Sequence, residues 1–423
     1  MNLCNWTRSA RTPEEAWSRN LTILLTAIFI EEMGWSLTAP FLPIYIQELG
    51  IPDPKKAALW AGLVMAASMV INSPMTPVWA ALADRFGRKL ILLRALAALA
   101  VSNFAIGLVG DVQQMLLVRL VSAFFTGLIP LSYAIITSSA PPAKMAQSVA
   151  HLQTVTIAAA SLAPLVGGIM VDRIGVRPGY FYASAMCVCG FLLVLLLFHN
   201  PARMDSAPAA RSQRAGLREA VLALLPFALV LFLVQIIDRS VQPLIPVYVD
   251  ELGGAAAGGV GFWSGLTVSL AGAAMAISAN VMARLSRYHS PAKLLLISLA
   301  GGAFCCAPIS YLRSVWQLTI ARTLLSLAVG GAVPLIFTVG SMTGLSRGSI
   351  GRSAILVMGQ QMGGSLGPLI GGALAQWSLR GVFVINSVLY LATLLFTHSV
   401  VHGGPAKKKD DCQRERPGSS RMN

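Results

Sequence analysis

Six charged residues interrupt stretches of the sequence that are otherwise apolar. A charge on a helix in the middle of a hydrocarbon layer costs about 2.5–3.5 kcal/mol, and a buried ion pair adds little net stability. Function therefore explains these groups better than stability does. A carboxylate in such surroundings can take up a proton or bind a cation, and a guanidinium is its natural counter-ion. The six residues are Glu31, Glu32, Asp238, Arg239, Arg119 and Arg322.

The elements that must hold these residues are long apolar helices. Of the 423 residues, 55% are hydrophobic and 12% are charged, against about 25% charged residues in soluble domains. About 20 apolar residues cross a bilayer as a helix, and no apolar run has the extended charged face that a soluble bundle needs. We therefore predict an all-α polytopic membrane protein with twelve spans. They lie near residues 20–47, 57–81, 89–109, 113–138, 145–171, 178–200, 220–249, 260–284, 292–311, 315–340, 350–378 and 380–401.

The chain contains an internal repeat. The segment PFLPIYIQELG, which starts at Pro40, returns as PLIPVYVDELG at Pro243, a shift of 203 positions. This duplication predicts two pseudo-symmetric six-helix halves, 1–200 and 220–401, with a site between them near the membrane midplane. A basic cytoplasmic linker, 201–219, would join the halves, and a basic cytoplasmic tail, 402–423, would be disordered. Three further matches at a shift of 203 or 204 are Trp60-Ala-Gly with Trp263-Ser-Gly, Arg119 with Arg322, and APLVGG with GPLIGG.

The distribution of basic residues predicts the orientation in the membrane. If both termini are cytoplasmic, 23 of the 32 Lys and Arg residues lie in cytoplasmic segments and 6 lie in the opposite loops. This bias follows the positive-inside rule. The net charge of +15 is therefore explained by loops beside a lipid bilayer, and we expect no nucleic-acid partner.

The register of the first span distinguishes its two acids. Adjacent side chains on a helix differ by about 100°, so Glu31 and Glu32 cannot share one narrow seam. Glu32 shares its face with Trp35 and Ser36, which predicts a cavity position, whereas Glu31 shares a small-residue face and is predicted at a helix boundary. A shift of 203 takes Glu32 to Gln235, so the acids are not repeated. Further polar residues that would line the cavity or bridge helices are Tyr133, Gln153, Gln360 and Gln361.

Three motifs resemble those of the major facilitator superfamily. The loop after the second span, AALADRFGRKLILL, is similar to that family's G-x-L-a-D-R-x-G-R-K-x-x-L-L signature, with Ala80 in the place of the first glycine. The fourth span carries LVRLVSAFFTG around Arg119, although Ser122-Ala123 replaces the usual Gln-Gly. The fifth and eleventh spans resemble the antiporter motif G-P-x-x-G-G. The matching residues are Asp84, Arg85, Gly87, Arg88 and Lys89 in the loop, and Pro164, Gly167, Gly168, Gly363, Gly367, Pro368, Gly371 and Gly372 in the two spans.

These motifs also have a physical interpretation of their own. Asp84 directly follows the second span, so its carboxylate would hold a neighbouring helix N-terminus through the helix dipole and pair with Arg88. The alternative is a basic loop that fixes topology and contains an incidental acid. The Gly and Pro residues of the two later spans permit close helix approach and a kink.

The resemblance covers the whole chain and is closest to the drug–proton antiporter branch of bacterial inner membranes. It implies a monomeric, multi-pass exporter of small lipophilic or cationic compounds, driven by the proton gradient, without a cofactor or metal and without enzymatic activity. Protons and substrate would compete for Glu32, and Arg119 would tune or relay the proton. The alternatives are a dedicated exporter of one metabolite, sugar or siderophore, an uncoupled uniporter or importer, and a transporter-like sensor or lipid-handling protein.

Overall fold

The computed structural model describes residues 13–141, 144–199, 217–341 and 350–403. Most of the predicted tail and most of the predicted linker lie outside these residues. All regular elements in the described residues are helices. They are α1 Pro13–Thr38, η2 Ala39–Phe41, α2 Leu42–Glu48, α3 Pro54–Phe86, α4 Arg88–Leu108, α5 Val112–Phe125, α6 Leu128–Ser139, α7 Met145–Ile174, α8 Val176–Leu197, α9 Leu217–Ser240, η3 Gln242–Leu244, α10 Ile245–Glu251, α11 Val260–Leu285, α12 Pro291–Cys306, η4 Ala307–Tyr311, α13 Val315–Val329, α14 Ala332–Ser341, α15 Ile350–Trp377 and α16 Gly381–Gly403.

Each predicted span coincides with one helix or with consecutive helices. In the described residues, ten stretches are long and apolar enough to cross a membrane, and α5 is a shorter apolar helix. The span predicted at 113–138 is not continuous, because α5 and α6 are separated at Thr126 and Gly127. Gly127 has a φ of 113°, a left-handed conformation that favours glycine and ends the helical hydrogen-bond pattern.

Acidic side chains fix two of the helix starts. The Asp53 carboxylate accepts hydrogen bonds from the backbone N–H groups of Lys55, at 2.9 Å, and Lys56. Asp111 accepts one from the N–H of Gln114 at 2.8 Å. Each carboxylate satisfies N–H groups that have no partner in the first turn of a helix, and so α3 and α5 begin where short polar loops end.

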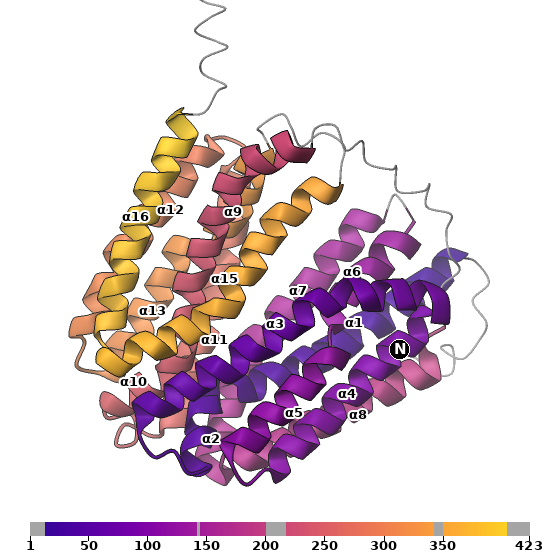
Figure 1. Cartoon of the computed structure of the whole chain (residues 1–423), viewed down its shortest axis with the longest axis horizontal. Helices are drawn as coiled ribbons and strands as arrows, with labels where there is room; N and C mark the ends of the chain where they lie inside the picture. Colours follow the sequence, from indigo (N-terminus) through magenta and orange to yellow (C-terminus); the bar gives the residue numbers. More distant parts are fainter. Residues whose placement is uncertain (1–12, 142–143, 200–216, 342–349, 404–423) are drawn as a thin grey trace, which may run out of the picture.

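The helices form an N-terminal group, α1–α8, and a C-terminal group, α9–α16, which are coloured indigo to pink and red to yellow in Figure 1. Three buried apolar clusters draw their residues from 17–198. A fourth cluster draws all but Ala58 from 227–390. The apolar cores therefore lie mainly within the groups and not between them.

Equivalent positions in the two groups make equivalent contacts. The Tyr45 hydroxyl donates to the carbonyl oxygen of Ile106 at 2.7 Å, and the Tyr248 hydroxyl donates to that of Ile309 at 2.6 Å. Both residues of the second bond are 203 positions after those of the first. Ser184 and Ser387, also 203 apart, each donate to a main-chain carbonyl of the neighbouring helix, at 2.7 and 2.6 Å. The repeat in the sequence thus corresponds to a repeat in the packing.

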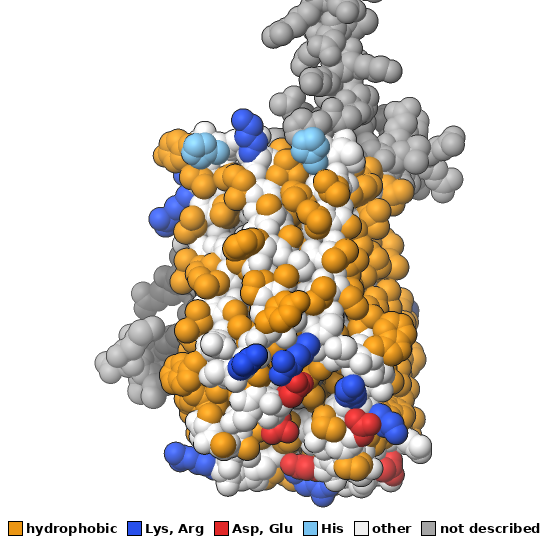
Figure 2. Space-filling view, turned by 90° about the vertical axis from the view of Figure 1, so that its left-hand side faces the viewer, with side chains coloured by type: hydrophobic (Ala, Val, Ile, Leu, Met, Phe, Trp, Pro, Cys, Tyr) orange, Lys and Arg blue, Asp and Glu red, His pale blue; other side chains and the backbone are white. Residues whose placement is uncertain are grey.

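The outer surface is suited to lipid. Figure 2 shows hydrophobic side chains over the middle of one face of the C-terminal group, with Arg, Lys and acidic side chains gathered toward its lower end. Large apolar residues such as Phe304, Trp316 and Leu395 are more than half exposed. A soluble protein rarely exposes so continuous an apolar surface, and this surface identifies the chain as a membrane protein.

The two groups meet mainly through two helix pairs, α3 with α15 and α7 with α11. These pairs join the groups at the lower end of Figure 1, where α2 and α10 lie, and we call this the closed end. A Cβ atom at Gly62 would collide with the carbonyl oxygen of Pro368, and one at Gly265 with that of Pro164. The two glycines are related by the repeat, as are the two prolines, so a single type of contact forms twice.

The glycines of the two Pro-Gly motifs pack against the backbone of neighbouring helices. Because a Cβ atom would not fit at these positions, only glycine allows the observed approach. Their nearest main-chain carbonyls are those of Leu37 for Gly167, Gly261 for Gly168, Phe232 for Gly363, Ile236 for Gly367, Ser240 for Gly371 and Ala58 for Gly372.

Polar contacts complete the closed end. The Asp172 carboxylate of α7 accepts hydrogen bonds from the N–H groups of Gly261, at 2.8 Å, and Phe262, at 2.6 Å, in the first turn of α11. Gln376 of α15 donates to the carbonyl of Lys55 at 2.6 Å, and the Lys55 ammonium lies 3.5 Å from the Gln376 carbonyl. All the hydrogen bonds between the groups that the structure describes join these same helix pairs.

Candidate functional site

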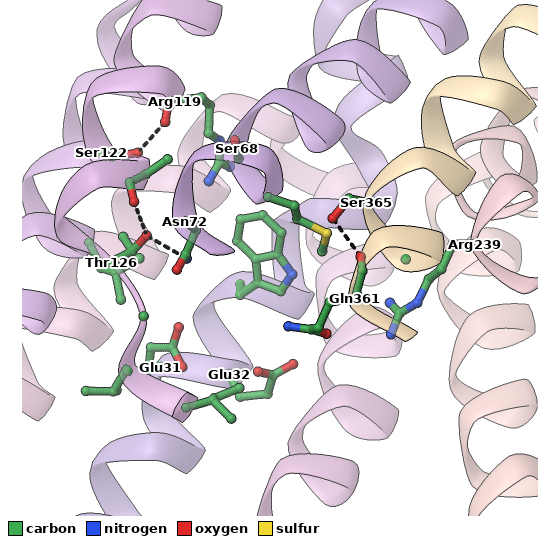
Figure 3. A pocket seen from close by; sticks show the side chains of 18 of the residues that line it. Glu31, Glu32, Ser68, Asn72, Arg119, Ser122, Thr126, Arg239, Gln361 and Ser365 are labelled. Carbon is green, nitrogen blue, oxygen red and sulfur yellow. Dashed lines mark hydrogen bonds between the residues drawn. The ribbon is translucent and has the colours of Figure 1, made fainter. Parts of the chain in front are cut away.

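A cavity of about 340 Å³ lies between the two groups of helices. Figure 3 shows side chains from both groups directed into it. Apolar residues, among them Met69, Leu99 and Trp35, supply part of its wall. A cavity lined mainly by apolar groups with a few polar ones is typical of small-molecule sites. Its polar lining consists of Glu31, Glu32, Ser68, Asn72, Arg119, Ser122, Thr126, Gln235, Arg239, Gln361 and Ser365.

Both acids of α1 line the cavity, which corrects the prediction of a helix-boundary position for Glu31. The two side chains diverge, as adjacent helical residues must, but the cavity is wide enough to receive both (Figure 3). The Ser36 hydroxyl donates to Glu32 Oε1 at 3.1 Å. Glu31 Oε2 is buried and has no hydrogen-bond partner in the described residues. An unpartnered buried carboxylate oxygen is costly, so Glu31 is suited to protonation or to binding a ligand.

The break between α5 and α6 borders the cavity beside Glu31 (Figure 3). Asn72 of α3 donates to the Thr126 hydroxyl at 3.0 Å and thereby ties the break to α3. Sequence reasoning missed Asn72, Thr126 and, on α3 and α15, Ser68 and Ser365. The spacing from Arg119 to Gly127 is repeated, but its connection with a helix break was not recognised.

The two cavity arginines have different surroundings. Arg119 is 5% exposed, and its guanidinium carbon lies 4.8 Å from the centre of the Trp35 ring, in a cation–π contact. No ion pair joins Arg119 to an acid in the described residues, contrary to its predicted role as a counter-ion. Arg239 reaches the cavity from α9 (Figure 3). It therefore places a positive charge of the C-terminal group in the same cavity as the two acids of the N-terminal group.

Asp238 and Arg322 lie away from the cavity lining. They form an ion pair of 3.2 Å within the C-terminal group, and their side chains are 22% and 12% exposed. A shift of 203 relates Arg322 to Arg119 and Asp238 to Trp35. The same arginine position thus faces an aromatic ring in one group and a carboxylate in the other.

Several predicted residues lie outside the cavity lining. Trp35, Gln235 and Gln361 line it, whereas Ser36, Tyr133, Gln153 and Gln360 do not. Ser36 is buried and bonds to Glu32, and Tyr133 packs against an apolar cluster of the N-terminal group. Gln153 is exposed on α7 and Gln360 is half-buried on α15. The rotational orientation of a helix, which the sequence left open, decides these placements.

The basic loop lies between α3 and α4. Gly87 has a φ of 93° and separates the two helices, which explains why glycine stands there. Arg88 is buried, and the Lys89 ammonium donates to the carbonyl of Leu195 at 2.7 Å. Arg85 is exposed. The side chain of Asp84 lies outside the described residues, so its predicted contact with a helix N-terminus stays a prediction.

No cluster of three His, Cys, Asp or Glu residues that could hold a metal ion occurs among the described side chains. The four cysteines that the structure describes, Cys187, Cys189, Cys305 and Cys306, are free thiols. The polar groups that line the cavity are instead carboxylates, guanidinium groups, amides and hydroxyls. These groups can hold ions and small polar molecules through charge and hydrogen bonds.

Comparison with known proteins gives a consistent result. The family model described as Major Facilitator Superfamily matches residues 24–343 and 264–419. The chain is 32% identical over 393 residues to "Multidrug resistance protein MdtG" of Enterobacter lignolyticus, covering 90% of this chain and 92% of that protein. The protein of the same name from Salmonella dublin is 30% identical, with 90% and 95% covered.

Solved structures of transporters share the fold. A bacterial homolog of the human lysosomal transporter Spinster, in an inward-facing and occupied conformation, superposes with a TM-score of 0.70 at 16% identity, over 93% of this chain and 98% of that one. The nucleoside transporter NupG superposes with a TM-score of 0.74 at 14% identity, over 90% and 99%. At these identities the likeness extends to the fold alone.

Proposed function

The chain belongs to the major facilitator superfamily and is a multi-pass membrane transporter rather than an enzyme, and from this premise we propose that it exports small lipophilic or cationic compounds in exchange for protons. The observation that carries this proposal is the pair of carboxylates, Glu31 and Glu32, in a cavity between the two groups of helices. The relatives named for multidrug resistance support export of several compounds.

The mechanism that we propose is alternating access. The N-terminal and C-terminal groups act as two rocking six-helix halves, with the cavity near the midplane. The closed end is the periplasmic side of the bacterial inner membrane, and both termini are cytoplasmic. This assignment is supported by the basic residues, which are concentrated in loops of the opposite side.

Exchange follows from competition for negative charge. A carboxylate is costly to enclose in a low-dielectric cavity unless a proton or a cation neutralises it. Protons from the periplasmic side and a cationic substrate from the cytoplasmic side therefore bind the same acids in turn. Only the neutralised forms close and reorient, so proton entry drives substrate exit. The proton gradient is the energy source, no cofactor takes part, and a monomer is sufficient.

Ethidium, a permanent lipophilic cation, is a suitable probe for this proposal. We expect everted vesicles with an acidic lumen to accumulate ethidium when they contain the wild-type protein, and to lose this accumulation with Glu32→Gln. Glu31→Gln measures the share of the second acid. Asp250→Asn, which removes an exposed acid of α10 outside the cavity, is the matched control and should behave as wild type. Acid-driven accumulation at the wild-type rate in both glutamine variants would refute the exchange mechanism.

A further inference from the structure

Arg239 is the one cavity guanidinium for which the described structure gives neither an ion pair nor an aromatic partner. It projects from α9 into the cavity (Figure 3), and its Nε is buried without a hydrogen-bond partner among the described residues. Arg119, by contrast, stacks on Trp35. A buried N–H group without an acceptor is unfavourable, and Arg239 as a whole is half-buried, so its guanidinium is available to bind an anionic group inside the cavity.

The packing of α9 against α15 fixes the direction of this side chain. A Cβ atom at Gly367 would come within 2.7 Å of the Arg239 Cβ, so the base of the side chain is held between the two helices. The guanidinium is left to extend toward the cavity, where Gln361 of α15 also points (Figure 3). Its position is therefore set by the scaffold of the C-terminal group.

The acid that Arg239 faces is Glu32. Both side chains line the cavity, one from each group of helices (Figure 3), so their opposite charges attract each other, although no ion pair joins them in the described residues. Glu32 is held by the Ser36 hydroxyl at 3.1 Å, and the repeat relates Ser36 to Arg239 at a shift of 203. Of two equivalent positions, one in each group of helices, the first thus bonds to this carboxylate and the second places a guanidinium in the same cavity.

We infer that Arg239 is a tethered cation that competes with cationic substrates for Glu32 and so determines which cations are transported. This inference rests on the proposed function. A small hydrated cation makes no contact with Glu32 that the guanidinium of Arg239 cannot also make. Arg239 outcompetes such a cation because its side chain is held covalently close to the acid. A lipophilic cation adds apolar contacts with Trp35, Met69 and Leu99 and displaces Arg239. The site thereby selects amphipathic cations over inorganic ones.

The inference is tested by ethidium binding to the purified full-length protein at pH 8, because an alkaline solution favours the carboxylate form of an acid. Arg239→Gln and the volume-matched Arg239→Met should each bind ethidium about tenfold tighter than wild type, equivalent to about 1.4 kcal/mol. Arg239→Lys keeps the charge and should bind within about twofold of wild type. Guanidinium ion at millimolar concentration should weaken ethidium binding to Arg239→Gln and leave wild type unchanged.

A double-mutant cycle identifies the acid. In a Glu32→Gln background, Arg239→Gln should change ethidium affinity by less than about twofold, whereas in a Glu31→Gln background the tenfold gain should persist. Equal affinity of wild type and both neutral Arg239 variants would overturn the inference, as would a gain that survives Glu32→Gln. If Glu32→Gln alone weakens binding while Arg239→Gln has no effect, the inference fails and the proposed function stands. If Glu32→Gln has no effect on binding, the inference fails, and if Glu31→Gln has no effect either, the proposed function fails with it.

Discussion

Asp172 of α7 gives the clearest test of how the closed end is held. Its carboxylate accepts two hydrogen bonds, at 2.8 and 2.6 Å, from the first turn of α11 in the other group of helices. The pocket around the acid is tight, because a Cβ atom at Gly261 would lie 2.8 Å from Asp172 Oδ1. We predict that Asp172→Ala opens the closed end by removing an anion from a helix N-terminus.

The magnitude follows from the contacts that are lost. Hydrogen bonds to a charged group contribute about 1.5–3 kcal/mol, and a negative charge at a helix N-terminus adds about 0.3–1 kcal/mol. Asp172 is exposed, and water can replace the acceptor, so the lower figure of about 1.5 kcal/mol applies. This free energy corresponds to a roughly tenfold fall in the ratio of closed to open molecules.

Spin labels report this ratio directly. Lys56 at the start of α3 and Ala256 in the loop before α11 are both exposed at the closed end. Cysteines at these positions in a cysteine-free background carry the labels, and pulsed electron resonance gives the distance distribution. Asp172→Ala should shift about tenfold more weight to the longer distances.

The control removes the same charge from the same end. Asp250 on α10 is exposed, and no hydrogen bond or ion pair of its side chain is described, so Asp250→Asn should leave the distribution unchanged. Identical distributions for Asp172→Ala and wild type would show that the helix pairs hold the closed end without this acid. Equal shifts in the two variants would indicate an effect of overall charge and contradict the reasoning.

Two further predictions concern packing and ion pairing. Gly265→Ala should lower the unfolding midpoint in detergent, because the added methyl group would collide with the Pro164 carbonyl. Gly364→Ala should leave the midpoint unchanged, because there is open space around Gly364. Equal midpoints for the two variants would refute the close-contact argument. Asp238→Asn leaves the largely buried guanidinium of Arg322 without its anion and should cost about 3 kcal/mol. The Asp238→Asn, Arg322→Gln double variant should recover most of this stability. No recovery in denaturant titrations would contradict the pairing.

The apolar runs predicted the helices well because each helix in a membrane must satisfy its own backbone hydrogen bonds. They could not predict which side of a helix faces the cavity, since that depends on tertiary packing. Glu31 and Gln153 were misplaced for this reason. The break at Gly127 was also missed, because hydropathy does not report a change of backbone conformation.

Asp172 was missed for a different reason. At the end of a predicted span, it was indistinguishable from an ordinary solvated loop acid. The repeat offered a signal, since a shift of 204 takes Asp172 to Gln376, and the two positions make related contacts with Phe262 and Lys55. Comparing the repeats position by position at span ends would have identified it.

The paired contacts of Gly62 with Pro368 and of Gly265 with Pro164 bear on the origin of the fold. Each repeat contributes one glycine and one proline, so a single repeat carries both surfaces of the joint. Two copies of a six-helix chain related by a two-fold axis would form both contacts at once, as isologous dimers do. After fusion of the copies, each contact surface could change separately. Asp172 at the contact of α7 with α11 corresponds to the amide Gln376 at the contact of α15 with α3, and this difference shows that the two surfaces have changed separately.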